Sequence, residues 1–171
     1  MLNATIILII LNIIMFFIQN SIEYGTAILG LNRLFIEGGL LYQPLSSMFA
    51  HGSIAHIVMN MIVLFQFGSL IEQVKGTKFF LSLYLIGGLL TSLFSFLFIY
   101  LLDLNHNLVG ASGAISVLIG WIAIKDSYNR KGLVIMMLLI SFAPLLLGMN
   151  IAWYAHIIGF IIGFLFGFIK R

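Results

Sequence analysis

The sequence predicts an all-α membrane protein: a bundle of six transmembrane helices with a short, central fourth helix. Two observations predict this class. Hydrophobic residues make up 62% of the 171 residues and charged residues only 8%, which is far more apolar than a soluble domain. Short polar clusters alone separate the apolar runs, so we expect a single domain over residues 1–171 without an added soluble domain.

Loop signals delimit six apolar segments. The first lacks the basic start and small-residue cleavage site of a signal peptide, so we expect it to remain as a helix. A long loop, roughly 20–53, precedes the second helix, and "DLNHNLV" from 103 to 109 follows the third. The short turn "GMN", 148–150, separates the last two. The predicted helices span about 4–19, 54–72, 79–102, 112–125, 133–149 and 151–169.

Basic residues predict the direction of these helices. Six spans place both termini on one side of the membrane, and seven of the eight basic residues fall on that side. Because cationic loops remain in the cytoplasm, we expect both termini to be cytoplasmic in a multi-pass protein of the cell membrane. Only Arg33 falls on the outer side, and the other seven are Lys75, Lys78, Lys125, Arg130, Lys131, Lys170 and Arg171.

Composition excludes several classes of function. The basic residues lie in loops and form no continuous face, so we expect no binding of nucleic acid. Cysteine is absent, which excludes disulfides, thiolate metal sites and cysteine nucleophiles. The sequence has no HExxH motif, and we expect neither a metal nor a cofactor.

Three polar side chains are predicted to lie at one depth in the bundle. Counting from the charged helix ends at 1.5 Å per residue puts Ser112, His156 and Asn60 roughly 18 to 21 Å above the cytoplasmic side. With a hydrocarbon core of about 30 Å, this level is on the order of 10 Å below the outer surface. The irregular chain before the fourth helix must descend to it, which requires a water-filled pocket open to the outside.

A serine and a histidine form the candidate catalytic pair. Ser112 begins the fourth helix, where free N–H groups and the helix dipole favour a developing negative charge. His156 is predicted at the same depth on the sixth helix, as a nucleophile and its general base require. Asp126, the only carboxylate between them in sequence, lies at the far end of the fourth helix. We therefore expect a dyad rather than a triad.

Glycines are expected to bring this pair together. Gly110 and Gly113 permit a tight turn and close packing around the serine. Gly159, Gly163 and Gly167 form a ridge on the sixth helix that would press against Gly113. Taken alone, such glycines commonly serve only the packing of membrane helices, so the serine–histidine pairing is what favours catalysis.

Polar residues of the second helix are candidate oxyanion donors. His56 and Asn60 are four residues apart and share one face of a helix, although a polar clamp between helices is the alternative. His51 lies about 140° around a continued helix from His56, so we expect its ring to point away and to tie the outer loop to this helix. Gln66 and Asn12 are expected to form hydrogen bonds between helices.

Three motifs occur in order along the predicted helices: "HGSIAHIVMN" with His51, His56 and Asn60, "GASG" with Ser112, and "AHIIG" with His156. Together with "LIEQVKG" they resemble the rhomboid family of intramembrane serine proteases, over roughly residues 40–168. The resemblance implies the minimal six-helix form, with Ser112 as nucleophile and His156 as general base and then general acid. It also implies an oxyanion hole made of His56, Asn60 and the Ser112 backbone N–H.

Two positions differ from the pattern common in that family. Many members carry a Trp-Arg pair in the outer loop, where this chain has Tyr42 and Gln43, so we expect the loop to be anchored differently. Many members also carry an aromatic residue four positions after the nucleophile, stacked on the catalytic imidazole. This chain has Ser116 there, and we expect that residue to pack between helices.

The resemblance also implies a substrate and a route of entry. The expected reaction is hydrolysis of a peptide bond in or beside a transmembrane helix of another protein, near the outer face. Its partners would be such proteins and the lipid bilayer. The substrate would unwind locally and enter between the second and fifth helices. Pro144 could bend the fifth helix there, and the turn 148–150 could act as a cap.

Other classes of function fit the sequence less well. An inactive family member that binds membrane helices is the main alternative, and the presence of Ser112 and His156 argues against it. A metal site would need His51, His56 and His156 to converge without a carboxylate ligand. A transporter is disfavoured because the sequence indicates no buried carboxylate and no inverted repeat. The α/β-hydrolase elbow is excluded, since its strand and its third residue are missing.

Overall fold

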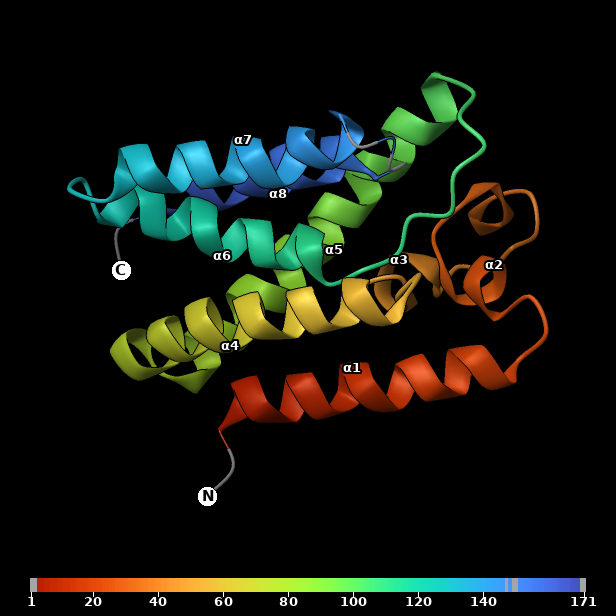
Figure 1. Ribbon diagram of the computed structural model, residues 1–171, viewed down its shortest axis with the longest axis horizontal. Helices are drawn as coiled ribbons and strands as arrows, with labels where there is room; N and C mark the ends of the chain where they lie inside the picture. Colours follow the sequence, from red (N-terminus) through yellow and green to blue (C-terminus); the bar gives the residue numbers. More distant parts are fainter. Residues whose placement is uncertain (1–2, 147, 149–150, 170–171) are drawn as a thin grey trace.

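The computed structural model describes residues 3–146, 148 and 151–169, and over these it is a bundle of helices with one isolated β-bridge (Figure 1). Three helices are long and apolar enough to cross a membrane, namely α1, Ala4–Ser21, α4, Ile54–Lys75, and α5, Thr77–Leu101. Three shorter helices complete the bundle, namely α6, Ser112–Lys125, α7, Arg130–Leu146, and α8, Trp153–Phe166. This architecture agrees with the predicted all-α membrane class.

Several helix ends differ from the predicted boundaries. α4 continues three residues further, to Lys75, and α7 begins three residues earlier, at Arg130. A long basic side chain can reach water from a helix end, so its charge need not stop the helix. α8 ends at Phe166, three residues earlier than predicted. Residues 149 and 150 of the predicted turn lie outside the described residues, so its role as a cap stays a prediction.

α6 is the central helix of the bundle. Every residue from Ala114 to Ala123 is buried, and α6 packs against α4, α5, α7 and α8. A helix that is apolar on all sides is typically enclosed by other helices. With 14 residues it is about 21 Å long, shorter than a hydrocarbon core of about 30 Å. A helix of this length does not reach from one face of such a core to the other.

Glycine allows the backbones of α6 and α8 to touch. A Cβ atom at Gly159 would overlap the carbonyl oxygen of Gly113, and one at Gly163 would overlap that of Val117. Gly120 makes a third contact of this kind with the backbone of α8. Only a residue without a side chain tolerates such an approach. The α6–α8 interface is the most extensive in the bundle, and these contacts fix α8 lengthwise against α6.

A buried carboxylate joins three helices. Glu72 of α4 accepts hydrogen bonds from the Ala4 and Thr5 N–H groups, at 2.8 and 2.9 Å, where α1 begins. The Thr5 and Thr77 hydroxyls donate two more, each at 2.7 Å. The start of a helix presents free N–H groups and favours a negative charge. The expectation that no carboxylate is buried is therefore wrong, because the helix start solvates Glu72.

The long loop between α1 and α4 contains short helices that the sequence pattern does not predict. Within it lie α2, Gly25–Leu29, the 3₁₀ helix η1, Arg33–Phe35, and α3, Gln43–Ser46. Each is at most five residues long, too short to show a helical repeat of apolar residues and too short to form alone. Contacts with the rest of the protein must stabilise them.

Backbone pairing attaches this loop to the segment before α6. Leu31 and Leu108 exchange N–H···O hydrogen bonds of 2.8 and 2.9 Å, forming an antiparallel bridge. Beside it, the Asn32 amide donates to Asn107 Oδ1 at 2.9 Å. Both segments are irregular on either side of this bridge, so it gives each of them a fixed register. The outer loop therefore helps to hold the chain that leads into α6.

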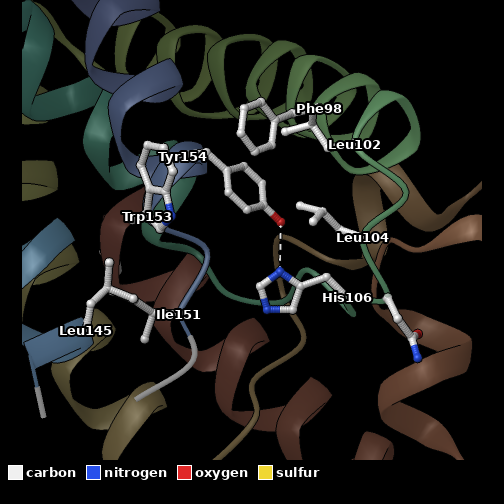
Figure 2. Close-up of a pocket in the computed structure, with 9 residues that line it drawn as sticks. Phe98, Leu102, Leu104, His106, Leu145, Ile151, Trp153 and Tyr154 are labelled. Carbon is white, nitrogen blue, oxygen red and sulfur yellow. Dashed lines mark hydrogen bonds between the residues drawn. The ribbon is translucent and has the colours of Figure 1, made fainter. Parts of the chain in front are cut away.

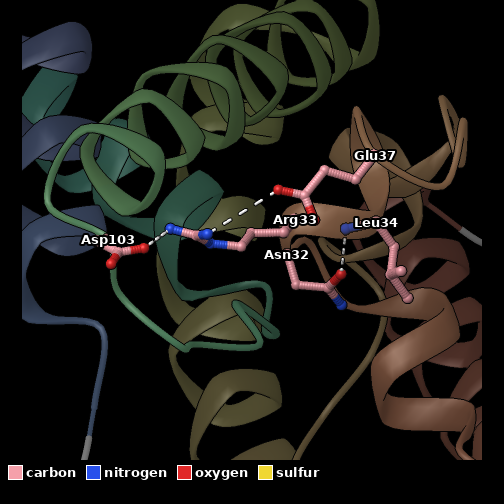
Figure 3. A network of polar contacts seen from close by, with 5 residues as sticks. All are labelled: Asn32, Arg33, Leu34, Glu37 and Asp103. Atoms are coloured by element: carbon pink, nitrogen blue, oxygen red, sulfur yellow. Dashed lines mark hydrogen bonds and ion pairs between the residues drawn. The ribbon is translucent and has the colours of Figure 1, made fainter.

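A charged cluster lies next to this bridge (Figure 3). Arg33 forms a salt bridge with Asp103, and its Nη1 atom lies 4.0 Å from Glu37 Oε1. Asn32 caps η1 by accepting the Leu34 N–H at 2.9 Å. The charged side chains are all more than a third exposed, so their pairing contributes little to stability. The backbone bridge and the Asn32 amide provide the firmer attachment.

Candidate active site

Ser112 and His156 meet where α6 begins. The His156 Nε2 atom lies 3.0 Å from Ser112 Oγ, within hydrogen-bonding distance. Ser112 is the first residue of α6, and His156 lies in the first turn of α8. The imidazole is 8% exposed, so it is largely shielded from bulk solvent. A hydroxyl hydrogen-bonded to an imidazole is the arrangement that activates a serine nucleophile.

The turn before α6 determines the position of Ser112. Gly110 has a φ of +123°, which other residues rarely adopt, and its N–H donates to the Ser47 carbonyl at 2.9 Å. The Ala111 N–H is directed at His51 Nε2 over 3.5 Å. α6 then begins at Ser112, and the N–H groups of a first turn have no partner within their own helix.

His56 and Asn60 border this turn. A Cβ atom at Gly110 would lie 2.8 Å from the His56 Nε2 atom and 3.5 Å from the Asn60 Nδ2 atom. The Asn60 side chain is buried, at 6% exposure, and its Nδ2 atom has no hydrogen-bond partner among the described residues. Leaving a buried amide donor unpaired costs free energy. Such a donor is available to a group that binds beside Ser112.

His51 lies beside His56, so the prediction that its ring points away is wrong. The centroids of the two rings are 5.1 Å apart. The helical angle does not apply because α4 begins only at Ile54 and His51 belongs to the preceding loop. Both ends of the Gln19 carboxamide hold the His51 backbone, at 2.8 and 2.9 Å. Burial, together with His56, lowers the pKa of His51 to about 4, so its ring is neutral near pH 7.

His156 has no carboxylate partner in the described part of the chain. Its Nδ1 atom makes no hydrogen bond there. Asp126 follows the opposite end of α6 and accepts hydrogen bonds from Asn129. Among the described residues, no three His, Cys, Asp or Glu side chains are grouped so that they could hold a metal ion. Within the described part of the chain, Ser112 and His156 therefore form a pair without a third, acidic member.

Ser116 lies one helical turn after Ser112. Its hydroxyl donates to the Ser112 carbonyl at 2.7 Å. A Cβ atom at Gly159 would lie 3.0 Å from the Ser116 Cβ atom, so a small side chain at this position lets α8 approach α6. At Ser116 this chain therefore has a close contact between α6 and α8, in place of the aromatic ring that the resemblance would lead one to expect beside His156.

Gln43 holds the outer loop together from inside. Its Nε2 group donates to the Ala27 and Ile28 carbonyls, at 3.0 and 3.2 Å. Its Oε1 atom accepts the Asn32 N–H at 3.3 Å. One fully buried carboxamide thus bonds three backbone groups around α2. Tyr42, by contrast, is exposed. Of these two residues, it is therefore Gln43 that anchors the loop.

A polar pair near the site was not predicted (Figure 2). The His106 Nδ1 atom and the Tyr154 hydroxyl are hydrogen-bonded at 3.0 Å, and the Tyr154 ring stacks on Phe98 with centroids 4.6 Å apart. They border a cavity of about 370 Å³ between α5, the loop before α6 and the facing ends of α7 and α8. This bond links the segment leading to Ser112 with the start of α8. A histidine in the polar loop was the only signal in the sequence.

Of the two residues expected to bond between helices, only Asn12 lies where it can do so. Gln66 is exposed on α4. Asn12 is buried, but its amide donates to the Leu8 carbonyl of its own helix at 2.7 Å. Its side chain also interacts with the buried Tyr84 hydroxyl of α5, which agrees with the expected contact between helices. Neither residue touches the Ser112 site through a described hydrogen bond.

These features define a class of protein: a helical membrane bundle with a partly buried serine–histidine pair at the start of its central helix. Comparison with known families agrees with this class. The model of the Rhomboid domain family matches residues 38–171, which includes Ser112, His156, His56 and Asn60. The chain therefore belongs to the rhomboid family.

Three curated relatives show how far the similarity extends. The chain is 30% identical to the rhomboid protease GluP of Bacillus subtilis over 133 residues, covering 74% of this chain and 25% of that protein. It is 34% identical to presenilin-associated rhomboid-like protein A, mitochondrial, of Danio rerio over 90 residues, covering 53% and 24%. It is 45% identical to RHOMBOID-like protein 12, mitochondrial, of Arabidopsis thaliana over 58 residues, covering 34% and 17%. The chain spans about a quarter or less of the length of these relatives.

Proposed function

We propose that the chain is an intramembrane serine endopeptidase in which Ser112 and His156 form a catalytic dyad. The observation that carries this proposal is the 3.0 Å separation of the His156 Nε2 and Ser112 Oγ atoms. The unpartnered Asn60 Nδ2 atom supports the same reaction, because acyl transfer needs donors for an oxyanion. Membership of the rhomboid family and similarity to a protein named as a protease agree with it.

In the first half of the reaction an acyl-enzyme forms. His156 accepts the hydroxyl proton of Ser112 as the oxygen attacks the carbonyl carbon of the scissile peptide bond. A tetrahedral intermediate forms, with negative charge on the former carbonyl oxygen. The C–N bond then breaks, and His156 gives its proton to the leaving amine. Water attacks the resulting ester by the same route, which releases the carboxylate product and restores the hydroxyl.

Three donors would stabilise the intermediate. They are the Asn60 Nδ2 group, a ring N–H of His56 and the backbone N–H of Ser112 at the free start of α6. The α6 dipole adds partial positive charge at the same point. His51 packs beside His56 and would hold the His56 ring in position. Gly110 leaves the space in which the His56 and Asn60 side chains reach the site.

Four glycines would act as structural support for the dyad. Gly110 and Gly113 lie on either side of Ser112 and shape the start of α6. Gly159 and Gly163 bring the α8 backbone against α6 and so hold His156 at the height of the serine. A side chain at any of these positions would move a reacting group or push the two helices apart.

The proposed substrate is a transmembrane segment of another membrane protein, cleaved near the outer face. A helical segment hides its carbonyl groups, so it must unwind before it can reach Ser112. α6 packs against both α4 and α7 and lies between them in Figure 1. Separation of α4 and α7 would therefore expose the start of α6. Pro144 lies near the end of α7, where loss of one backbone hydrogen bond eases bending.

We propose that the chain crosses a cell membrane six times as one domain over residues 1–171, with both termini cytoplasmic. The concentration of basic residues at one end of the bundle supports this orientation. Two of the relatives have mitochondrial in their names, so the membrane itself needs a direct test. Reporter domains fused to each terminus should both be protected from externally added protease in intact cells, and digestion of either one would reject this topology.

The test of activity is cleavage of a fluorescent transmembrane peptide by the purified protein in detergent. The wild type should cleave it, whereas Ser112→Ala and His156→Ala should each lower the rate by at least about 10³-fold. A chelator should leave the wild-type rate unchanged. Equal cleavage by Ser112→Ala would reject the dyad. Binding of the peptide without cleavage by all three proteins would favour an inactive binder of membrane helices.

A further inference from the structure

The seam between α5 and α8 is hollow at one end. α5 has 25 residues and α8 has 14, so their lengths are about 37 and 21 Å and α8 cannot cover its neighbour completely. Where α8 finishes and α5 starts, a cavity of about 570 Å³ remains. Most of its lining is apolar and includes Phe79 and Ile86 of α5 and Phe166 of α8.

This cavity opens on the surface of the bundle that faces lipid. Of the residues that line it, Leu83 is buried, whereas Ile86 and Ile169 are exposed. Exposed aliphatic side chains on a membrane-spanning helix contact the acyl chains of the bilayer. An acyl chain therefore has direct access to the cavity and finds apolar walls on both sides.

A cation lies in the lining of the same cavity. Lys78 is exposed and borders the apolar walls, and the Lys75 ammonium group lies 5.6 Å from the centroid of the Phe79 ring. Lys78 forms no salt bridge with any described carboxylate. The nearby Glu72 is already hydrogen-bonded by threonine hydroxyls and backbone N–H groups. Among the described residues that line the cavity, Lys78 is thus a cation and none is an anion.

The other end of the same seam provides an internal comparison. The cavity bordered by His106 and Tyr154 also has apolar walls, formed by Phe98, Leu104 and their neighbours (Figure 2). No Lys, Arg, Asp or Glu lines it among the described residues. Of these two cavities, the one at the start of α5 combines apolar walls with a described cation, Lys78, and the other does not.

We infer that the cavity beside Lys78 binds one anionic phospholipid. Its acyl chain lies along Phe79, Ile86 and Phe166, and its phosphate accepts hydrogen bonds from the Lys78 ammonium group. A free phosphate has no acyl chain to contact the apolar walls. In phosphatidylcholine, the choline cation offsets the attraction between the phosphate and the Lys78 ammonium group. One lysine at a lipid surface favours an anionic headgroup by about fivefold in binding.

The test is native mass spectrometry of the purified full chain with an equal mixture of dioleoylphosphatidylglycerol and dioleoylphosphatidylcholine. The wild type should retain the anionic lipid about fivefold more than the other. Lys78→Gln should remove this preference and Lys78→Arg should keep it. Lys131→Gln makes the same charge change on α7 outside the cavity, and should leave the preference intact.

A filling substitution tests the place of the acyl chain. Ser82 is exposed and lines the cavity, so Ser82→Phe should lower retention of both lipids, whereas Lys78→Gln lowers only that of the anionic one. The proposal is overturned if the two lipids are retained equally by the wild type. It is also overturned if Lys131→Gln acts as strongly as Lys78→Gln, or if the cavity is occupied by a second copy in a lipid-independent dimer.

Discussion

Ser112 and His156 are 44 positions apart in the chain, and their contact depends on neighbours that carry no reactive group. Gly110 turns the backbone with a positive φ, and the same position leaves room for the His56 and Asn60 side chains. The residue types that shape the site are therefore as tightly constrained as those proposed to react. Changes at single residues should accordingly separate effects on reaction rate from effects on stability.

Asn60 should act on the rate rather than on substrate binding. Asn60→Ala removes a proposed oxyanion donor, and we expect kcat to fall by about 10²- to 10³-fold with little change in KM. The measurement is steady-state cleavage of the transmembrane peptide. Gln66→Ala changes an exposed carboxamide on the same helix and is the matched control. A fall in Asn60→Ala that comes only from a higher KM would contradict a role in the transition state.

His51 should make stability depend on pH. Its pKa is lowered to about 4 by burial, with His56 adding to the effect, whereas an unfolded imidazole titrates near 6.5. Between these values the unfolded state binds more protons, so the free energy of unfolding should fall as pH decreases from 6.5 to 4, by on the order of 3 kcal/mol. Above pH 6.5 this contribution should be fully present.

Unfolding in mixed detergent micelles at several pH values measures this effect. His51→Gln removes the titrating ring, so its stability should fall less steeply below pH 6.5 than that of the wild type. The other histidines remain in both proteins. They account for the pH dependence of the free energy of unfolding that remains in His51→Gln. Identical slopes in the two proteins would show that protonation of His51 does not limit stability.

The candidate site could be predicted from the sequence because depth and spacing follow from helix geometry. Ser112, His156 and Asn60 were expected at one level, and in the structure their side chains surround the start of α6. The position of His51 was predicted wrongly, since spacing on a helix says nothing about a residue that precedes it. The His106–Tyr154 bond was missed because it joins a loop to a helix, and no periodic pattern connects them.

Two kinds of contact hold the helices together. The α6–α8 interface is glycine-rich, whereas α1, α4 and α5 are joined through a carboxylate that accepts four hydrogen bonds. These two kinds of contact lie in different parts of the bundle. Disruption of either should therefore produce a distinct defect.

Glu72→Gln should destabilise the bundle without direct contact with the proposed dyad. A carboxamide nitrogen cannot accept the bonds that one carboxylate oxygen now accepts, so at least one buried donor loses its partner. We expect the free energy of unfolding to fall by roughly 2–4 kcal/mol, measured by thermal or detergent-induced unfolding. Gln73→Ala alters the exposed neighbour and should have little effect. Equal stability of Glu72→Gln and wild type would contradict the clamp.

Phe142→Gly should speed cleavage if the end of α7 acts as a gate. The Phe142 and Trp153 rings lie 5.6 Å apart between α7 and α8, so removing one ring weakens the contact that holds α7 in place. The rate with a helical transmembrane substrate should rise, whereas a short, unstructured peptide should be cleaved at an unchanged rate. If the helical substrate is also cleaved at the wild-type rate, entry does not depend on α7.

The long apolar helices could be predicted from the sequence, whereas the outer loop could not. Helices such as α4 and α5 are long enough to cross the hydrocarbon core of a bilayer, and their apolar composition makes them evident. α2, η1 and α3 are each too short for a periodic signal and depend on Gln43 and the Leu31–Leu108 bridge. Their positions follow from tertiary contacts, which a single sequence does not reveal.

The whole molecule is a membrane bundle of the rhomboid family that contains a proposed hydrolytic site. The end of the bundle at which α6 begins would provide the chemistry. The opposite end carries Lys78 and the inferred lipid cavity. Because α6 is enclosed by its neighbours, the two ends of the bundle keep the same position relative to each other. We therefore expect that removing a lipid from the Lys78 end leaves the Ser112–His156 distance unchanged.

The most direct measurement of the central proposal is covalent labelling of the purified protein with a serine-directed fluorophosphonate, followed by mass spectrometry of its peptides. The wild type should gain one adduct, on Ser112, because His156 increases the nucleophilicity of that hydroxyl. Ser112→Ala and His156→Ala should remain unlabelled under the same conditions. An adduct on another residue, or equal labelling of Ser112 after His156→Ala, would contradict the proposed dyad.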